Sequence, residues 1–290
     1  MGQRVLFGIV APLAARLPEW LLACLAAVAG IVGYLCAPGP RGAVDHNLQI
    51  VRPEIDPRTR RRLVLATFVH GALGYVELFK LMTISADRMQ RTFPASGWEH
   101  VDAGLAEGKG VVIVSAHLGS PSAAGQLFGI RGLPTYMVVE ALQPPDLYEK
   151  VTALRSRFGA QFIPGDRSAV RAILTALRSN GVVGIMADRD VKGSGDVLRF
   201  FGQPARLSPA AATFALRSGA MVIPAVTYRT APFRGVLHIY PPIALTRSGD
   251  TAADVREASE RILEVMELLI SAAPQQWAVF SDVWEQESMT

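Results

Sequence analysis

Short β-branched apolar runs alternate with helical patterns over most of the chain. The run VVIVSA at Val111–Ala116 contains one polar residue and is typical of a strand covered on both faces. Segments of similar character predict further strands at Thr135–Val139, Gln161–Ile163, Val182–Ala187, Met221–Val226 and Gly235–Tyr240. Strands that alternate with helices indicate an α/β fold, so we expect a mostly parallel central sheet flanked by helices.

The helices predicted between these strands lie at about 121–129, 145–158, 167–179 and 209–218, with a long amphipathic helix at 254–269. The helix at 209–218 has clear boundary signals, because Ser208 suits an N-cap, Pro209 suits the first helical position and Gly219 follows the end. Another long helix is predicted upstream, at 57–84. No linker interrupts residues 41–290, so we expect them to form a single α/β domain.

The first 40 residues differ from the rest because they are almost entirely apolar. No charged residue occurs from Trp20 to Pro40, and a helix needs about 20 apolar residues to span a bilayer. A cleaved signal peptide fits poorly, since no A-x-A-like site precedes Pro38. We therefore expect residues 1–40 to be a hydrophobic helical segment that associates with a membrane. A spanning anchor, a hairpin in the membrane interface and a buried core helix all remain open, because small residues such as Gly30 suit close packing.

Composition and charge narrow the possible partners. Half of the 290 residues are hydrophobic and 19% are charged, which excludes ordinary disorder. Of the 29 basic residues only four are lysines, and arginine favours bidentate contacts to phosphates and carboxylates, although a GC-rich genome produces the same bias. The cluster of Arg58, Arg60, Arg61 and Arg62 would face anionic lipid if the apolar segment lies flat beside it; a solvated helix face is the alternative. We expect an anionic membrane surface as partner and no nucleic acid.

Chemically active side chains follow several of the predicted strands. The strand VVIVSA runs into His117, the next strand ends at Glu140, and Val182–Ala187 ends at the cluster Asp188, Arg189 and Asp190. Ligands bind beyond the carboxyl ends of strands in open parallel sheets. These residues therefore predict an active site at that edge.

A neutral histidine at such an edge can take a proton from a hydroxyl when a carboxylate orients its other nitrogen. No second His or Cys lies within ligand spacing of His117, so we expect no metal. Cys24 and Cys36 both lie in the apolar segment and indicate neither a disulfide scaffold nor a metal site. The absence of a G-x-S-x-G motif argues against a serine hydrolase.

Several blocks together resemble the bacterial lipid A late acyltransferase family, which includes the phosphatidylinositol mannoside acyltransferases. The likeness spans about residues 40 to 285 and is somewhat closer to the mannoside branch. Its blocks, in the order of the chain, are IVSAHLGS at 113–120, LRSRFG at 154–159, GIMADRD at 184–190, FFGQPAR at 200–206, LRSGA at 216–220 and PQQW at 274–277.

The resemblance implies a function and a cellular place. An enzyme of this kind would move a fatty acyl group from acyl-CoA or acyl-carrier protein to a hydroxyl of a membrane glycolipid or phospholipid, with His117 as general base. It would act at the cytoplasmic face of the bacterial plasma (inner) membrane and need no bound cofactor. The matching positions also imply that Ser122, Arg155, Asp188, Arg189, Asp190 and Arg206 contact substrate.

One position departs from the family's H-x4-D/E motif, because Ser122 stands where the carboxylate is expected. A serine cannot stabilise an imidazolium by charge, and loss of an orienting carboxylate can lower a rate by orders of magnitude. The resemblance offers Glu140 and Asp196 as replacement catalytic carboxylates. The alternatives are a non-catalytic relative that binds lipid or a partner, and a hydrolase of thioesters or esters.

Overall fold

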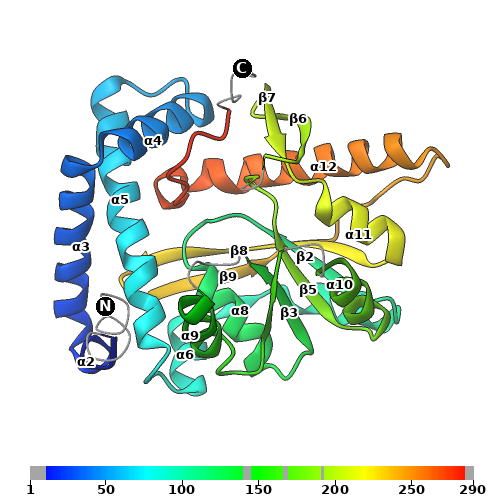
Figure 1. The fold of residues 1–290 in the computed structure, drawn as a ribbon, viewed down its shortest axis with the longest axis horizontal. Helices are drawn as coiled ribbons and strands as arrows, with labels where there is room; N and C mark the ends of the chain where they lie inside the picture. The colour runs from blue at the N-terminus through cyan, green and yellow to red at the C-terminus, as the bar shows by residue number, and fades with distance from the viewer. Residues whose placement is uncertain (1–10, 140–144, 166–168, 191–192, 285–290) are drawn as a thin grey trace.

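A computed structural model describes residues 11–139, 145–165, 169–190 and 193–284 (Figure 1). Its centre is a seven-stranded sheet in the order β1-β9-β8-β2-β5-β3-β4. All neighbouring strands are parallel except β8 and β9, which are antiparallel, so the predicted fold class is confirmed. The strands are β1 (Ala95–Ser96), β2 (Val111–Ser115), β3 (Thr135–Val139), β4 (Gln161–Pro164), β5 (Val182–Met186), β8 (Met221–Ala231) and β9 (Arg234–Ile239).

Both faces of the sheet are covered, as the strand β2 illustrates. Val112 and Val114 belong to one hydrophobic core, and Val111 and Ile113 belong to another. Successive side chains of a strand point to opposite faces, so a strand buried on both sides must be apolar throughout. The helices beside the sheet are α6 (Ala86–Thr92), α7 (Trp98–Ala106), α8 (Pro121–Ile130), α9 (Pro145–Arg155), α10 (Ala169–Arg178), α11 (Ala210–Ser218) and α12 (Thr251–Ala272).

Three local features differ from the sequence predictions. An antiparallel hairpin of β6 (Asp196–Phe200) and β7 (Gln203–Leu207) was not predicted; only alternate residues of each strand are buried, so neither strand forms an apolar run. Pro209, not Ser208, occupies the N-cap of α11. β8 continues five residues past Val226 because β9 pairs with its outer half.

A layer of N-terminal helices lies along one side of the sheet domain (Figure 1). It contains α2 (Ala11–Arg16), α3 (Glu19–Cys36), α4 (Pro38–Val51) and α5 (Pro57–Lys80). Helix α3 runs beside α5 at very close range, since a Cβ on Gly30 would lie 2.6 Å from Val69 Cα. Among the described residues, α3 and α5 are both long and apolar enough to cross a bilayer.

The outer face of α3 is exposed and apolar, so α3 is not the fully buried core helix that was one of the alternatives. Its exposed large side chains are Trp20, Leu25, Val28, Ile31, Val32 and Leu35.

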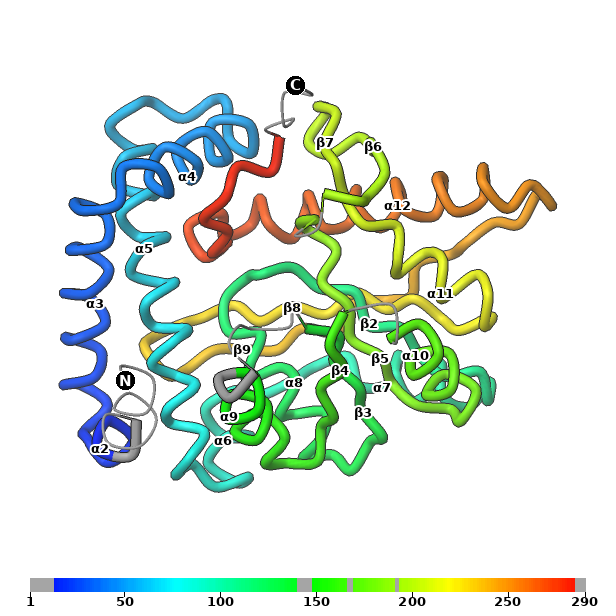
Figure 2. The backbone as a smooth tube through the Cα atoms, viewed as in Figure 1, coloured from blue at the N-terminus to red at the C-terminus, as the bar shows by residue number. Residues whose placement is uncertain are grey.

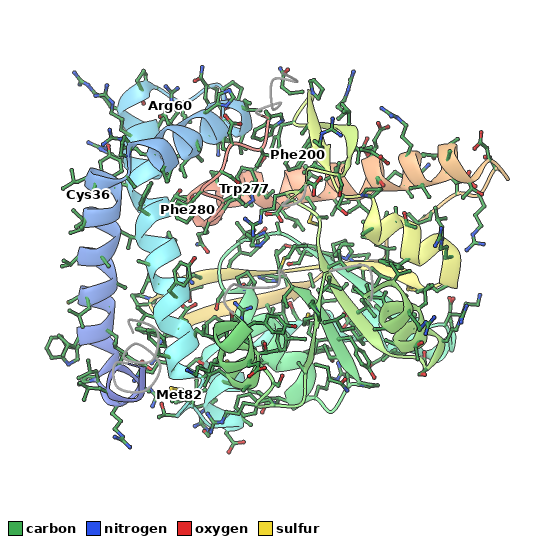
Figure 3. All side chains as sticks on the ribbon, in the orientation of Figure 1. Cys36, Arg60, Met82, Phe200, Trp277 and Phe280 are labelled. Atoms are coloured by element: carbon green, nitrogen blue, oxygen red, sulfur yellow. The ribbon has the colours of Figure 1, made fainter. Side chains whose placement is uncertain are left out.

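The chain returns to the N-terminal layer after α12. We call residues Pro274–Trp284 the C-terminal strap; it begins with a 3-10 turn, η2 (Pro274–Gln276), and runs between α5 and the β6–β7 hairpin (Figure 2). Asn47 of α4 donates to Ser281 O at 2.9 Å, and Trp284 Nε1 donates to Phe200 O at 3.1 Å. Phe280, labelled in Figure 3, packs edge-on against Phe68 of α5. The strap therefore joins the helical layer to the sheet domain.

Candidate active site

His117 and Asp188 meet because their strands are neighbours in register. Ser115, the last residue of β2, pairs with Met186, the last residue of β5. His117 and Asp188 each lie two residues beyond these ends, and Ala187 N still donates to Ser115 O at 2.9 Å. The two strand exits thus bring an imidazole and a carboxylate together at the carboxyl edge of the sheet, where the alternation of strands and helices predicts a site.

The Asp188 carboxylate contacts both the ring and the backbone of His117. His117 Nδ1 lies 2.9 Å from Asp188 Oδ1, and His117 N donates to Asp188 Oδ2 at 2.8 Å. Trp277 Nε1 of the C-terminal strap donates to the same Oδ2 at 2.7 Å. Asp188 is fully buried, whereas the side chain of His117 is 29% exposed. Solvent or a substrate can therefore reach the histidine but not its carboxylate partner.

The environment keeps Asp188 ionised. Burial by itself raises the pKa of the Asp188 carboxyl, but the attraction of His117 and the three hydrogen bonds from His117 and Trp277 outweigh it, so the pKa lies below its usual value. An ionised carboxylate only accepts hydrogen bonds, so His117 Nδ1 carries the proton and donates it. In its neutral form the ring then has a free lone pair on Nε2, which is the form required of a general base.

The loop His117–Ser120 is fastened on several sides. Ala278 N donates to His117 O at 2.9 Å and Gly119 N donates to Gln276 O at 3.1 Å, so the C-terminal strap holds one side. Ser120 N donates to Thr227 Oγ1 of β8 at 2.7 Å. Gly119 has a φ of +63°, and a Cβ there would lie 2.0 Å from Thr227 O, so only glycine fits. The position of the histidine is thereby determined by two separate elements.

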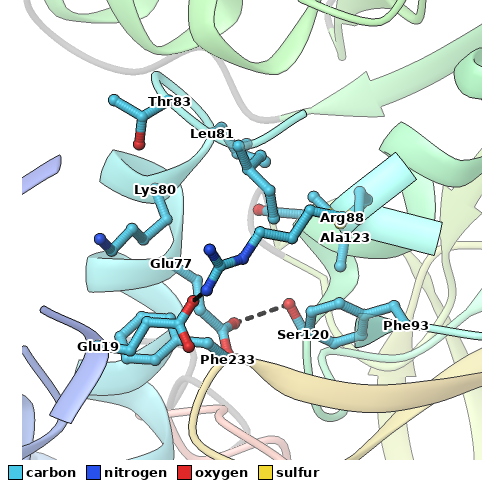
Figure 4. A pocket seen from close by; sticks show the side chains of 13 residues that line it. Glu19, Glu77, Lys80, Leu81, Thr83, Arg88, Phe93, Ser120, Ala123 and Phe233 are labelled. Atoms are coloured by element: carbon cyan, nitrogen blue, oxygen red, sulfur yellow. Dashed lines mark hydrogen bonds and ion pairs between the residues drawn. The ribbon is translucent and has the colours of Figure 1, made fainter. Parts of the chain in front are cut away.

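A cavity of about 90 Å³ opens beside this loop (Figure 4). Ser120 and Ser122, at the start of α8, form part of its wall, and the C-terminal end of α5 forms another part. The cavity is mixed in character. Its apolar side chains are Leu81, Ile84, Met89, Phe93, Ala123 and Phe233, and its charged ones are Glu19, Glu77, Lys80 and Arg88.

Among the described residues, the carboxylate that contacts His117 is not Asp196. Glu140 lies outside the described residues. Asp196 is exposed at the first position of β6, opposite Leu207. Asp188, which the resemblance assigned to substrate, is the carboxylate that the structure places on His117.

The other residues predicted to contact substrate make contacts of their own. Asp190 accepts a hydrogen bond from Gly195 N, and Arg206 donates to Gly195 O at 2.8 Å, so both brace the turn before β6. Arg189 is half-buried directly after Asp188. Arg155 ends α9 with its guanidinium 6.0 Å from the centre of the Phe162 ring, and burial lowers the pKa of that guanidinium.

Sequence reasoning missed Trp277 as a partner of Asp188. Trp277 is the last residue of the PQQW block. The presence of this block in the family resemblance was the available signal that Trp277 has a role at the site. It also missed Glu77, His70 and Arg229, which form a buried polar cluster behind the loop. Among the described residues, no group of three or more His, Cys, Asp or Glu side chains is arranged to hold a metal ion.

Comparison with known proteins matches the chain to one family along nearly its whole length. The sequence model of the family described as "Bacterial lipid A biosynthesis acyltransferase" matches residues 5–286. A phosphatidylinositol mannoside acyltransferase of Mycobacterium tuberculosis (strain ATCC 25618 / H37Rv) is 31% identical over 72% of this chain. That of Mycolicibacterium smegmatis (strain ATCC 700084 / mc(2)155) is 26% identical over 77% of this chain, and the match covers 72% of the relative. A lipid A biosynthesis lauroyltransferase of Escherichia coli (strain K12) is 25% identical over 81% of this chain and 75% of its own length. The match to the first relative spans 66% of that protein's length.

Proposed function

Because the chain belongs to the bacterial lipid A biosynthesis acyltransferase family, we propose that it transfers a fatty acyl group from a thioester donor to a hydroxyl of a membrane glycolipid or phospholipid. The observation that carries this proposal is the His117–Asp188 pair at the carboxyl edge of the sheet. The donor is acyl-CoA or acyl-carrier protein, both of which present the acyl group as a thioester.

In the proposed reaction His117 Nε2 accepts the proton of the acceptor hydroxyl. The hydroxyl oxygen of the acceptor attacks the carbonyl carbon of the thioester at the same time. The buried Asp188 carboxylate stabilises the imidazolium that forms. When the tetrahedral intermediate collapses, the C–S bond breaks and the imidazolium returns its proton to the departing sulfur. The product is an ester and a free thiol, and His117 regains its neutral form without a covalent enzyme intermediate.

The acceptor is proposed to be a glycolipid that offers a sugar or inositol hydroxyl. Relatives with two different names support this class: those named for phosphatidylinositol mannoside match at 31% and 26% identity, and the one named for lipid A at 25%. A neutral imidazole activates such a hydroxyl well, because a weakly acidic alcohol is a poor nucleophile until a base removes its proton.

We place the enzyme on an anionic membrane, at the cytoplasmic face of the plasma membrane. Helix α3 supports this placement because it packs on α5 with one side and exposes an uncharged apolar face with the other. Arg16 ends α2, just before α3 begins, and Arg58, Arg60, Arg61 and Arg62 lie in the first turns of α5, at the end of the helical layer where Figure 3 labels Arg60. Apolar burial together with arginine–phosphate attraction is how interfacial helices bind lipid.

The decisive experiment compares wild-type protein with His117→Ala. Each is incubated with radiolabelled acyl-CoA, or acyl-carrier protein, and a total lipid extract, and labelled lipids are separated from free fatty acid. Wild type is expected to form a labelled lipid and the variant to form none, while circular dichroism shows an unchanged fold. Wild-type turnover by the variant would remove His117 from the mechanism.

The observation that favours a non-catalytic relative is Ser122, which replaces the family's carboxylate. Asp188 weakens this alternative, since it already supplies a carboxylate to His117. Any labelled lipid formed by wild type and lost in His117→Ala rules the alternative out. Release of free fatty acid at the rate of transfer, without an acceptor, would instead indicate a hydrolase.

A further inference from the structure

A buried ion pair lies behind the loop that carries His117. Arg229 of β8 donates to Glu77 of α5 through two nitrogens, Nε to Oε1 at 2.9 Å and Nη2 to Oε2 at 2.8 Å. Both residues are more than nine-tenths buried. The fork-to-fork geometry is the strongest form of such a pair and fixes the relative orientation of the two side chains.

The surroundings complete the pair. Arg229 Nη1 lies 3.0 Å from His70 Nδ1, and burial followed by the charge of Arg229 lowers the pKa of His70 to about 4. A neutral His70 therefore accepts from the guanidinium. On the other side, Ser120 Oγ donates to Glu77 Oε2 at 2.7 Å, as Figure 4 shows. Each side of the pair thus reaches a further polar group.

The backbone of Arg229 is also connected to the His117 loop. Gln276 Oε1 accepts from Arg229 N at 2.7 Å, and Gln276 Nε2 donates to Arg229 O at 2.9 Å. The carbonyl of Gln276 accepts in turn from Gly119 N. The loop is therefore tied to the ion pair twice, through the Ser120 hydroxyl and through Gln276.

Stability alone does not account for this arrangement. Removing two charges from water is costly, and a buried ion pair is often no more stabilising than apolar residues of the same volume. The pair does fix the orientation of the Glu77 and Arg229 side chains, because a bidentate contact tolerates little rotation. The carboxylate of Glu77 accepts from the Ser120 hydroxyl. The backbone of Arg229 holds Gln276, which accepts from Gly119 N of the same loop.

We propose that Glu77 and Arg229 form a positioning pair that holds the His117–Ser120 loop, through Ser120 and Gln276, in the orientation required for acyl transfer. The proposal rests on the acyl transfer proposed above. It assigns the pair no contact with substrate and no proton transfer. Under this proposal helix α5, which carries Glu77 and packs against α3, helps to position the active-site loop.

Ser120 gives the cleanest test. Replacing Glu77 or Arg229 leaves a buried charge without its partner and can prevent folding. The Ser120 hydroxyl makes no helix-capping bond at the start of α8, so Ser120→Ala removes the link to Glu77 and leaves the ion pair intact. Ser259→Ala is the matched control, because Ser259 is also buried but its hydroxyl donates to Val255 O within α12.

Two measurements are made on each variant. In the first, kcat and KM for acyl transfer are determined alongside the thermal midpoint. We expect Ser120→Ala to lower kcat about tenfold to a hundredfold with KM within about twofold, because small displacements of a reacting group have effects of that size. Ser259→Ala should leave kcat unchanged at a similar midpoint.

In the second measurement, the imidazole signals of ¹⁵N-histidine-labelled protein are recorded, with His117→Ala to assign the His117 signal. Ser120→Ala should shift or broaden the His117 signal, and Ser259→Ala should not. Unchanged kcat and an unchanged His117 signal in Ser120→Ala would overturn the proposal. Because the spectra need no turnover, they test the positioning even if wild type shows no acyl transfer, which would contradict only the proposed function.

Discussion

Asp188 accepts hydrogen bonds from both the backbone N–H and the ring of His117, so one carboxylate fixes the start of the residue and the direction of its imidazole. Every polar contact that the structure gives Asp188 comes from a donor, and the third is Trp277 Nε1. A side chain at position 188 must therefore accept hydrogen bonds and cannot donate them.

Asp188→Asn should abolish most of the acyl transfer while leaving a folded protein. An amide has one acceptor oxygen, so its NH2 group faces a donor, and the Nδ1 proton of His117 loses its partner. Loss of the corresponding carboxylate in a serine-protease triad lowers kcat about 10⁴-fold, and we expect a fall of about 10³-fold or more here. Steady-state kinetics measures it.

Asp254→Asn is the control for Asp188→Asn. Asp254 is also buried and accepts from Ser248 N and Oγ, but it lies at the start of α12. Its replacement should lower the unfolding midpoint without changing kcat. Equal kinetic losses in both variants would mean that Asp188 acts through stability alone.

Trp277→Phe should lower kcat about tenfold and stability by about 1.5–3 kcal/mol, the range for a hydrogen bond to a charged group. The phenyl ring keeps the aromatic contact with Phe200 but cannot donate to Asp188. Trp284→Phe is its counterpart in the same aromatic cluster, because Trp284 Nε1 donates to Phe200 O instead. The expectation fails if Trp284→Phe reduces kcat as much as Trp277→Phe does.

The alternation of apolar runs was sufficient to predict the α/β fold and to place His117 and Asp188 at strand exits. It was not sufficient to pair them. The pairing depends on β2 lying beside β5 with Ser115 opposite Met186, and strand order is set by packing across the whole domain. The family resemblance instead offered Glu140 and Asp196 as carboxylates for the histidine; Glu140 lies outside the described residues, and the contact seen is made by Asp188.

The buried polar cluster was harder still to predict. Glu77 and His70 lie in α5, where charged and apolar residues are mixed as in many helices. Arg229 lies near the end of the long strand β8. Nothing local distinguishes Glu77 and Arg229 from solvated residues, because they are buried by contacts with each other and with Gln276 of the C-terminal strap. A long-range contact of this kind has no periodic signature in the sequence.

His70 should make stability depend on pH below neutrality. The pKa of His70 is about 4 in the folded protein against 6.5 ordinarily, because burial and Arg229 disfavour its charged form. Between these values unfolding takes up about one proton, so this contribution is complete above pH 6.5 and is lost as the pH falls toward 4. Urea unfolding at pH 7, 6 and 5 should show a steeper decline for wild type than for His70→Asn, whose amide oxygen can still accept from Arg229. Parallel declines would contradict this assignment.

Val28→Glu on the outer face of α3 should weaken binding to vesicles that contain anionic lipid, with the fold unchanged because the side chain is 58% exposed. Burial of an aliphatic side chain contributes about 1.5–3 kcal/mol, and a carboxylate adds repulsion from the lipid phosphates. Leu268→Glu, on α12, is the control, since Leu268 is 73% exposed on the sheet domain. Co-sedimentation that falls equally in both variants would argue against α3 as the membrane-binding face.

Ser122→Asp restores the family's carboxylate five residues after the histidine, yet it should not raise kcat. His117 has one N–H on the Nδ1 side, and Asp188 Oδ1 already accepts it. The new side chain would instead enter the cavity that Ser122 lines, whose wall already carries Glu19 and Glu77 as well as Lys80 and Arg88. We expect kcat to be unchanged or to fall up to about tenfold, the range of a general acid–base contact that is disturbed but not lost.

Ser122→Asn, of nearly the same volume and without charge, separates the effect of the charge from that of size. A several-fold rise in kcat in Ser122→Asp alone would show that His117 lacks a sufficient carboxylate in the natural sequence, and that Asp188 does not fill that role.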